Sequence, residues 1–66
     1  MFSYTEEELN SLSPNWRDVL INIDHNRLSY GAYAQANNIK LGTIKSRLHR
    51  ARAKVMKIRE QNANAQ

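Results

Sequence analysis

The sequence predicts an all-α fold: a small four-helix domain that contains a helix-turn-helix and ends in a long basic helix. Three observations support this prediction. No stretch alternates apolar and polar residues over a useful length, whereas several stretches repeat apolar residues at helical spacing. The chain has 66 residues, which allows one domain with a modest core. It has no cysteine, so neither a disulfide nor a thiolate metal site can reinforce the packing of its helices.

The first helix is predicted to be short and to begin after Thr5. The stretch TEEE, residues 5 to 8, has the form of a capping box. Thr5 is its N-cap, and Glu8 reaches back to the backbone of that residue. Leu9 and Leu12 then lie on one face, which gives the helix a side to bury.

The second helix is predicted to begin at Ser13-Pro14, because proline at the first helical position gives up no hydrogen bond. An amphipathic stripe follows at helical spacing: Trp16, Val19, Leu20 and Ile23. We expect this helix to end between Asp24 and Asn26. Trp16 begins the stripe, so we interpret it as a core anchor rather than a platform for stacking bases.

The third helix is predicted to run from Tyr30 to about Asn37, with Ser29 as its N-cap. Its inward residues are expected to be Tyr33, Ala34 and either Ala36 or Asn37. Asn37-Asn38 is a stop signal, because asparagine tolerates the left-handed conformation that ends helices. Ile39-Lys40 then forms a short turn before the last helix.

The fourth helix is predicted to start near Leu41 and to run to about Gln61, a length of roughly 30 Å. A helix of about eight residues, a short turn and a longer basic helix give the outline of a helix-turn-helix. We expect one domain over residues 1–61, followed by a flexible polar tail over residues 62–66.

The two faces of the fourth helix differ in chemistry. At about 100° per residue, six residues fall within one apolar arc that is predicted to pack on the core: Leu41, Ile44, Leu48, Ala51, Val55 and Ile58. The opposite arc, here called the outward face, consists of Gly42, Ser46, His49, Arg50, Ala53 and Lys57. Its small residues would allow a close approach to another surface.

Charge is divided unevenly along the chain. Residues 1–39 carry five acidic and two basic side chains, net −3, whereas residues 40–66 carry eight basic and one acidic, net +7. No acid lies between Asp24 and Glu60, so the cations of the last helix repel one another unless an external anion offsets them. An anionic membrane or a calmodulin-like groove would need a bulky exposed apolar face. The second and third helices are expected to cover that face, which favours double-stranded DNA as the partner.

The B-DNA major groove is about 12 Å wide and admits a helix of this kind. We predict a base-reading set on or beside the outward face: Lys45, Ser46, His49 and Arg50. We predict a phosphate set around it: Lys40, Thr43, Arg47, Arg52 and Lys54. Arg17 and Arg27 stay open between a phosphate contact and a solvated surface role.

Other functions have little support in the residues. His25 and His49 are far apart in sequence and have no cysteine or paired carboxylate beside them, so we expect no metal and no cofactor. Ser29 and Ser46 lack base and acid partners at the spacing that a nucleophile needs, so we expect no enzyme. No apolar run approaches about 18 residues, and a signal peptide is not evident, so we expect no membrane segment and a cytoplasmic protein.

The stretch LSYGAYAQANNIKLGTIKSRLHRARAKV, residues 28–55, resembles region 4 of bacterial sigma factors, most of all those of the extracytoplasmic-function type. The run GTIKSRLHRAR, residues 42–52, carries most of this resemblance. Upstream, LNSLSPNWRDVLIN is similar to the segment that opens the region. The resemblance implies a helical domain whose last helix enters the major groove of a promoter −35 element. It also implies base and phosphate contacts at the positions of Lys45, Ser46, His49 and Arg50, and docking on the flap of the RNA polymerase β subunit.

The chain departs from the family pattern at several positions. Gly31-Ala32 replaces an acidic pair, and Gly31 costs roughly 0.5–1 kcal/mol of helix stability relative to alanine. Tyr33 replaces a branched aliphatic residue, and Asn38 replaces a turn glycine. Lys40 stands where a capping serine or threonine is common, which puts a cation at the positive end of the helix dipole unless a phosphate lies close by.

The promoter-melting and polymerase-clamping domain of a sigma factor is absent from these residues. We therefore expect an excised domain or a small stand-alone regulator, as a phage or mobile element carries. The opening Met1 favours the regulator.

Two alternatives stay open beside DNA binding. The domain could serve mainly as a protein-interaction module that docks on RNA polymerase or mimics a sigma domain. It could also be a small dimeric repressor, since helix-turn-helix dimers bind half-sites about one DNA turn apart. A monomer is favoured, because no spare apolar face is evident unless Phe2, Tyr4 and Trp16 provide one. Phe2 and Tyr4 precede the first cap and are expected to fold back as a staple.

Overall fold

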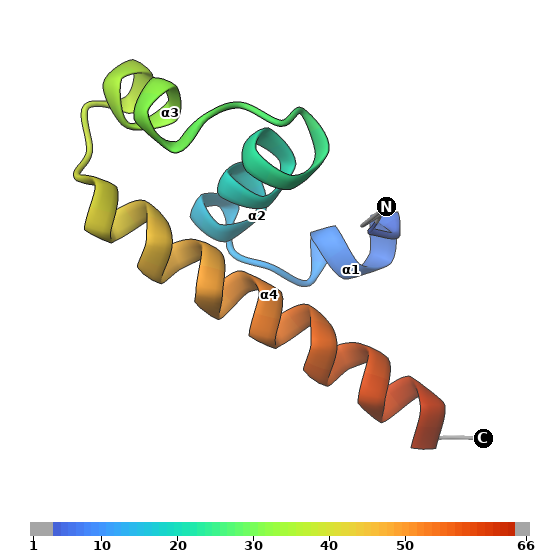
Figure 1. Ribbon diagram of the computed structural model, residues 1–66. Helices are drawn as coiled ribbons and strands as arrows, with labels where there is room; N and C mark the ends of the chain where they lie inside the picture. The colour runs from blue at the N-terminus through green and yellow to red at the C-terminus, as the bar shows by residue number, and fades with distance from the viewer. Residues whose placement is uncertain (1–3, 65–66) are drawn as a thin grey trace.

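The computed structural model describes residues 4–64, and in that range the chain is helical with no strand. Figure 1 shows the shorter helices α1, α2 and α3 arranged along one side of the long C-terminal helix α4. The elements are α1 (Glu6–Asn10), α2 (Pro14–Leu20), the π-helical segment η1 (Ile21–His25), α3 (Tyr30–Asn37) and α4 (Leu41–Asn64). The all-α, four-helix prediction is therefore confirmed, with η1 as a continuation of α2.

The predicted capping box begins α1. The Thr5 hydroxyl accepts a hydrogen bond from the backbone N–H of Glu8 at 3.1 Å, and the Glu8 carboxylate accepts one from the backbone N–H of Thr5 at 2.9 Å. Two donors that the start of the helix would leave without partners are satisfied in this way. The cap also fixes the position of Glu8, whose side chain is buried against the rest of the molecule.

The second helix, α2 together with its continuation η1, begins at Pro14 and ends at His25, which lies between Asp24 and Asn26 as predicted. Its last turn widens into η1, and the backbone N–H of Asn26 donates to the carbonyl of Ile21 at 2.9 Å. Arg27 then adopts a left-handed conformation with φ 58°. The π-helical segment was not predicted, because the spacing of apolar residues does not distinguish hydrogen bonds between residues five apart from those between residues four apart.

The third helix and the turn after it also follow the prediction. The Ser29 hydroxyl accepts from the backbone N–H of Ala32 at 3.1 Å, and Asn38 ends the helix at φ 54°, ψ 48°. Tyr33 is buried, but the expectation that Ala36 or Asn37 points inward is wrong, since both are exposed. The chain turns at Asn38, and the half-buried Ile39 packs against the core in their place.

The core lies between α4 and the three shorter helical segments. Its buried apolar side chains are Leu12, Val19, Leu20, Ile23, Tyr33, Ile44, Leu48, Ala51 and Val55. Trp16 is half-buried and packs against this cluster, which agrees with a role as a core anchor. Tyr4 also packs against it, as expected for the staple, whereas Phe2 lies outside the described residues.

Four of the six residues predicted for the apolar arc of α4 are buried, and Ile58 is half-buried. Leu41 is the exception, with 47% of its surface exposed. It is the first residue of α4, so no earlier helical turn continues the packed face, and Ile39 from the turn contacts the core instead.

The long helix continues further than expected. α4 has 24 residues and ends at Asn64, whereas the sequence predicted an end near Gln61 and a flexible tail from residue 62. Gln61, Asn62 and Ala63 are exposed, so hydrogen bonds within the helix, rather than packing, stabilise their helical conformation. The rest of the predicted tail, residues 65–66, lies outside the described residues. α4 defines the long axis of a molecule that measures 43 × 19 × 17 Å.

Candidate nucleic-acid interface

The outward face of α4 lies open to solvent along its whole length. Each of its residues is exposed, whereas Ile44, Leu48 and Val55 on the opposite side are buried. Gly42 has no atom of another part of the protein within 4 Å of the position that a Cβ would occupy. The small residues on this face therefore leave the helix backbone accessible to a large partner such as a nucleic acid.

All four members of the base-reading set are exposed and share one side of α4. At about 100° per residue, Lys45 to Arg50 span an arc of roughly 140°, with Ser46 and His49 between them. Leu48 faces the other way and is only 2% exposed. The structure thus brings the set together on a face that no other element covers.

Four members of the phosphate set border this face. Lys40 precedes the first residue of α4 and is exposed, Lys54 is exposed, and Thr43 and Arg47 are half-buried. The charge of Arg47 acts on the nearby hydroxyl of Tyr33, which donates a hydrogen bond to the carboxylate of Asp18. Burial and this hydrogen bond raise the pKa of Tyr33 to about 12, so the hydroxyl keeps its proton.

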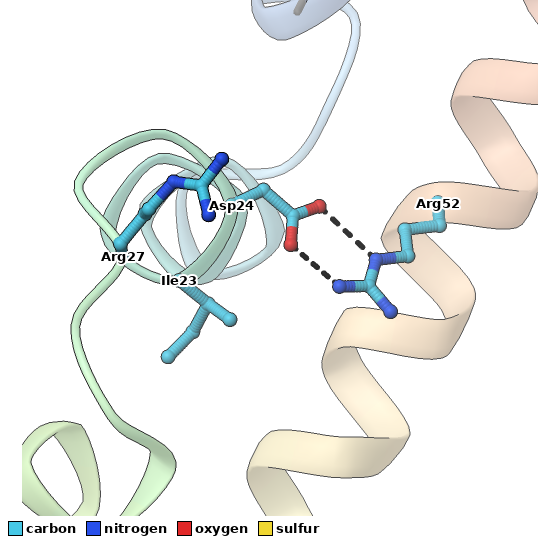
Figure 2. Close-up of a pocket in the computed structure, with 4 residues that line it drawn as sticks. All are labelled: Ile23, Asp24, Arg27 and Arg52. Atoms are coloured by element: carbon cyan, nitrogen blue, oxygen red, sulfur yellow. Dashed lines mark hydrogen bonds and ion pairs between the residues drawn. The ribbon is translucent and has the colours of Figure 1, made fainter. Parts of the chain in front are cut away.

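Arg52, the fifth member, is engaged within the protein, which corrects the expectation of a freely available phosphate ligand. Figure 2 shows its guanidinium facing Asp24 through two parallel contacts: Nη2 to Oδ1 at 2.5 Å and Nε to Oδ2 at 3.0 Å. The Tyr4 hydroxyl donates to Oδ2 of the same carboxylate at 2.5 Å. Burial alone would raise the pKa of Asp24, but hydrogen bonds from Arg52 and Tyr4 and the charge of Arg52 lower it below its usual value.

A second arginine of α4 is paired in the same way. Arg59 binds Glu8 through Nε to Oε2 at 2.6 Å and Nη2 to Oε1 at 3.0 Å. Its guanidinium carbon lies 5.8 Å from the centre of the Tyr4 ring. The hydrogen bond from Arg59 is the main cause that lowers the pKa of Glu8 from its ordinary value of 4.5 to about 2.

Sequence reasoning missed both ion pairs, although a signal for them exists. Arg52 and Arg59 are seven residues apart, so they share one edge of α4 beside its apolar arc. We call Arg52 and Arg59 the paired edge. The sequence predicts Glu8 only as a capping residue, and no acid lies between Asp24 and Glu60 to mark a partner within the last helix. The partners come instead from α1 and η1.

The other cations of α4 keep their charge available. Among the described residues, Lys45, Arg47, Arg50, Lys54 and Lys57 form no ion pair. Internal acids therefore neutralise two of the seven basic residues between positions 42 and 61 and leave five. The repulsion among these five is what an anionic partner would relieve.

The two arginines that the sequence left open differ in their surroundings. Arg17 is half-buried, and its Nη1 donates to Oδ1 of Asn10 at 3.5 Å, so it borders α1. Arg27 is exposed, has positive φ, and lines a pocket between η1 and α4. Arg27 therefore lies beside the helix that carries the base-reading set.

No helix within residues 4–64 combines the length and the apolar character needed to cross a membrane. His25 and His49 are both exposed and come from different elements. Within the same range, three or more histidine, cysteine, aspartate or glutamate side chains nowhere gather as metal ligands do.

Comparison with known proteins adds one match. No curated protein and no solved structure shows significant similarity to the chain. A family model described as sigma-70, region 4, matches residues 3–55, which include α1, α2, η1, α3 and the part of α4 that holds the base-reading set. The family consists of DNA-binding regulatory domains that also bind RNA polymerase and are not enzymes. The chain thus belongs to the sigma-70 region 4 family and is a DNA-binding helix-turn-helix domain of the kind involved in promoter recognition.

Proposed function

We propose that this protein binds double-stranded DNA sequence-specifically by inserting α4 into the major groove of a promoter element similar to the −35 element. The observation that carries the proposal is the contrast between the two sides of α4. Leu48 and its apolar neighbours are buried, while Ser46, His49 and Arg50 are exposed on a face that has small residues at its centre. A helix with these two faces can lie in a groove about 12 Å wide without any movement of the core.

The base-reading set would supply the sequence preference. The forked guanidinium of Arg50 matches the O6 and N7 acceptors of guanine, and Lys45 can donate to the same atoms. The Ser46 hydroxyl both donates and accepts, so it adapts to several base edges. The His49 ring can donate to a base acceptor or accept from an exocyclic amine, depending on its tautomer.

The phosphate contacts would come from both flanks of α4. Lys40, Thr43, Arg47 and Lys54 border the groove-facing side, and their contacts would fix the register of the helix without reading sequence. Lys40 lies at the positive end of the helix dipole, where a phosphate stabilises what would otherwise be an unfavourable cation. Arg52 can contribute only through the N–H groups that Asp24 leaves free.

Contact with RNA polymerase, at the flap of the β subunit, is a second part of the proposal. Family members bind both DNA and polymerase. Leu28, Leu41 and Met56 are large apolar side chains that are exposed here, and they lie outside the base-reading set. Pull-down of polymerase at a salt concentration that removes DNA would support this contact. We propose a monomer as the acting species, and light scattering of the DNA complex measures this directly.

The proposal is tested by selecting bound sites from random duplexes at near-physiological salt, with the wild type and His49→Ala in parallel. We expect the wild type to enrich one site and His49→Ala to change the preferred base at one or two positions, with little change in affinity for random DNA. His25→Ala is the matched control, because His25 is also exposed but belongs to η1. Identical enriched sites for all three proteins would contradict the base-reading assignment.

A further inference from the structure

A pocket of about 430 Å³ lies between η1 and α4, outside the base-reading set. Ile23, Asp24, Arg27 and Arg52 line it. In Figure 2 Arg27 comes from the segment that follows η1 and Arg52 from α4, with Asp24 between the two. The fold therefore gathers two guanidinium groups at one opening, although the two arginines are 25 residues apart in sequence.

Arg27 has a left-handed backbone conformation, which arginine rarely adopts, so its presence at this position needs an explanation. The described chain has two residues other than glycine with positive φ, Arg27 at 58° and Asn38 at 54°. Both follow the end of a helix, where the left-handed conformation lets backbone N–H groups beyond the helix bond to its last carbonyls. Leu28 donates in this way to the carbonyl of Asn22 at 2.9 Å.

Asparagine is suited to this conformation, and arginine is not. Asn38 therefore needs no further explanation, whereas Arg27 occupies its position at a cost in free energy. Its side chain is exposed and has no ion pair among residues 4–64, so no charge interaction of the side chain within the described fold explains an arginine at this position. The hydrogen bond from Leu28 explains the left-handed backbone but not the choice of arginine, and a residue poorly suited to its backbone conformation is a mark of a functional position.

The carboxylate in the pocket does not cancel the two cations. Both oxygens of Asp24 accept hydrogen bonds, from Arg52 and Tyr4, and its side chain is only 9% exposed. The Arg52 side chain is 45% exposed and uses Nε and one N–H of Nη2 on Asp24, which leaves the Nη1 donors free. With three charged groups, the pocket has a net charge of +1 and offers guanidinium donors to solvent.

The position of the pocket indicates which anion it takes. Arg52 follows Lys45 by seven residues, so the two lie on the same flank of α4, about 10.5 Å apart along the helix axis. The pocket thus extends the cationic flank of the helix that we place in the groove. A backbone phosphate carries one negative charge and suits the planar fork of arginine.

We propose that Arg27 and Arg52 together bind one phosphate of the DNA backbone, beside the groove that α4 occupies. Asp24 orients the Arg52 guanidinium for this contact, which is the role of a positioning residue. The inference rests on the proposed DNA-binding function and adds a contact that lies outside the helix-turn-helix face.

The test is the salt dependence of binding to the selected duplex, measured by fluorescence anisotropy for the wild type and Arg27→Asn. Asparagine accepts the left-handed backbone, so we expect the melting temperature of Arg27→Asn to equal or exceed that of the wild type. We expect its affinity at about 0.1 M salt to fall about five- to tenfold on every sequence, with the salt slope smaller by about 0.9. Arg17→Gln, which removes the same charge beside α1, is the control and should leave the slope unchanged.

The outcomes separate this inference from the function on which it rests. If the wild type binds the selected duplex and Arg27→Asn matches it in affinity and slope, the phosphate site is wrong and the proposed function stands. If Arg27→Asn binds DNA normally but loses polymerase in a pull-down, the pocket takes an acidic protein surface and the inference is overturned. If the wild type itself shows no preference for any duplex, the proposed function fails.

Discussion

The cations of α4 fall into two groups that differ in what faces them. Lys45 and Arg50 point into solvent and have no ion pair within the described chain. Arg52 and Arg59 on the paired edge are held by Asp24 and Glu8, which are nearly buried. Both groups contain arginine, and both lie on one helix. A cation of α4 stabilises the fold where a nearly buried carboxylate of α1 or η1 lies within reach, and elsewhere its charge stays available to a partner.

This difference explains how a short chain without disulfides carries so basic a helix. Glu8 and Asp24, from the N-terminal half, form ion pairs with one edge of the helix and so tie α1 and η1 to α4. On the opposite side no acid of the described residues forms an ion pair with α4, so the repulsion that remains is directed to where a polyanion can relieve it. The comparison predicts that substitution of Arg59 lowers stability and that substitutions in the base-reading set lower DNA binding, while Arg52 contributes to both.

The largest expected effect is on binding, from Arg50→Ala. Loss of a bidentate base contact costs about 1–3 kcal/mol of binding free energy on the preferred site. The melting temperature should stay within about 2 °C of the wild type, because an exposed side chain without partners contributes little to folding. Anisotropy on the selected duplex and thermal unfolding by circular dichroism measure the two effects. A large fall in melting temperature with unchanged binding would place Arg50 in the wrong group.

The converse variant is Arg59→Ala on the paired edge. It leaves the Glu8 carboxylate buried without its main partner, so the free energy of unfolding should fall by about 1 kcal/mol after allowance for the partial exposure of the pair. In a domain of this size that corresponds to a melting temperature lower by about 4–8 °C. Glu60→Ala, the exposed neighbour, is the control and should change little. Weaker DNA binding with unchanged stability would contradict the division into two groups.

The ion pair of Glu8 also predicts how stability responds to acid. Its pKa is near 2 in the folded protein and near 4.5 ordinarily, so the unfolded state binds more protons in between. The stabilisation is therefore complete above about pH 4.5 and is lost as the pH falls from there toward 2. Glu8→Gln should be less stable than the wild type at pH 7, and the gap should narrow across that window. A constant gap from pH 7 to pH 2.5 in urea unfolding would show that the charge of Glu8 is not what stabilises the fold.

The smallest effect is expected from Gly31→Ala in α3. Gly31 lies in a helix, and apart from its chain neighbours and the local helix backbone no atom stands within 4 Å of the position of its missing Cβ. Alanine should therefore raise the free energy of unfolding by about 0.5–1 kcal/mol without any clash. Binding to the selected duplex should not change, which would show that greater stability alone does not strengthen binding. Chemical denaturation and anisotropy measure both quantities.

Local signals in the sequence predicted most of the fold. The capping box at Thr5, the proline start at Pro14, the Ser29 cap and the left-handed stop at Asn38 each act within a few residues, and each is confirmed. The prediction that Leu41 packs on the core was wrong, because helical spacing indicates which face of a helix a residue occupies but not where along the helix the packing ends.

The candidate site was also predicted only where local signals decide the structure. Helical periodicity predicted that the base-reading set is exposed on one side of α4, because exposure there depends on the helix alone. The partners of Arg52 and Arg59 come from elements 28 and 51 residues away, so no local pattern reveals them. The pocket at Arg27 depends on the same long-range packing. Whether each exposed residue reads a base or a phosphate stays a prediction.

The central claim is that DNA meets α4 on the side opposite the core and leaves the paired edge at Arg59 untouched. Titration of isotope-labelled protein with the selected duplex, followed by amide chemical shifts in NMR spectra, tests it most directly. The account predicts the largest shifts at Lys45, Ser46, His49 and Arg50, with Glu8 and Arg59 nearly unchanged. Shifts concentrated at Glu8 and Arg59, with the base-reading set unchanged, would contradict it.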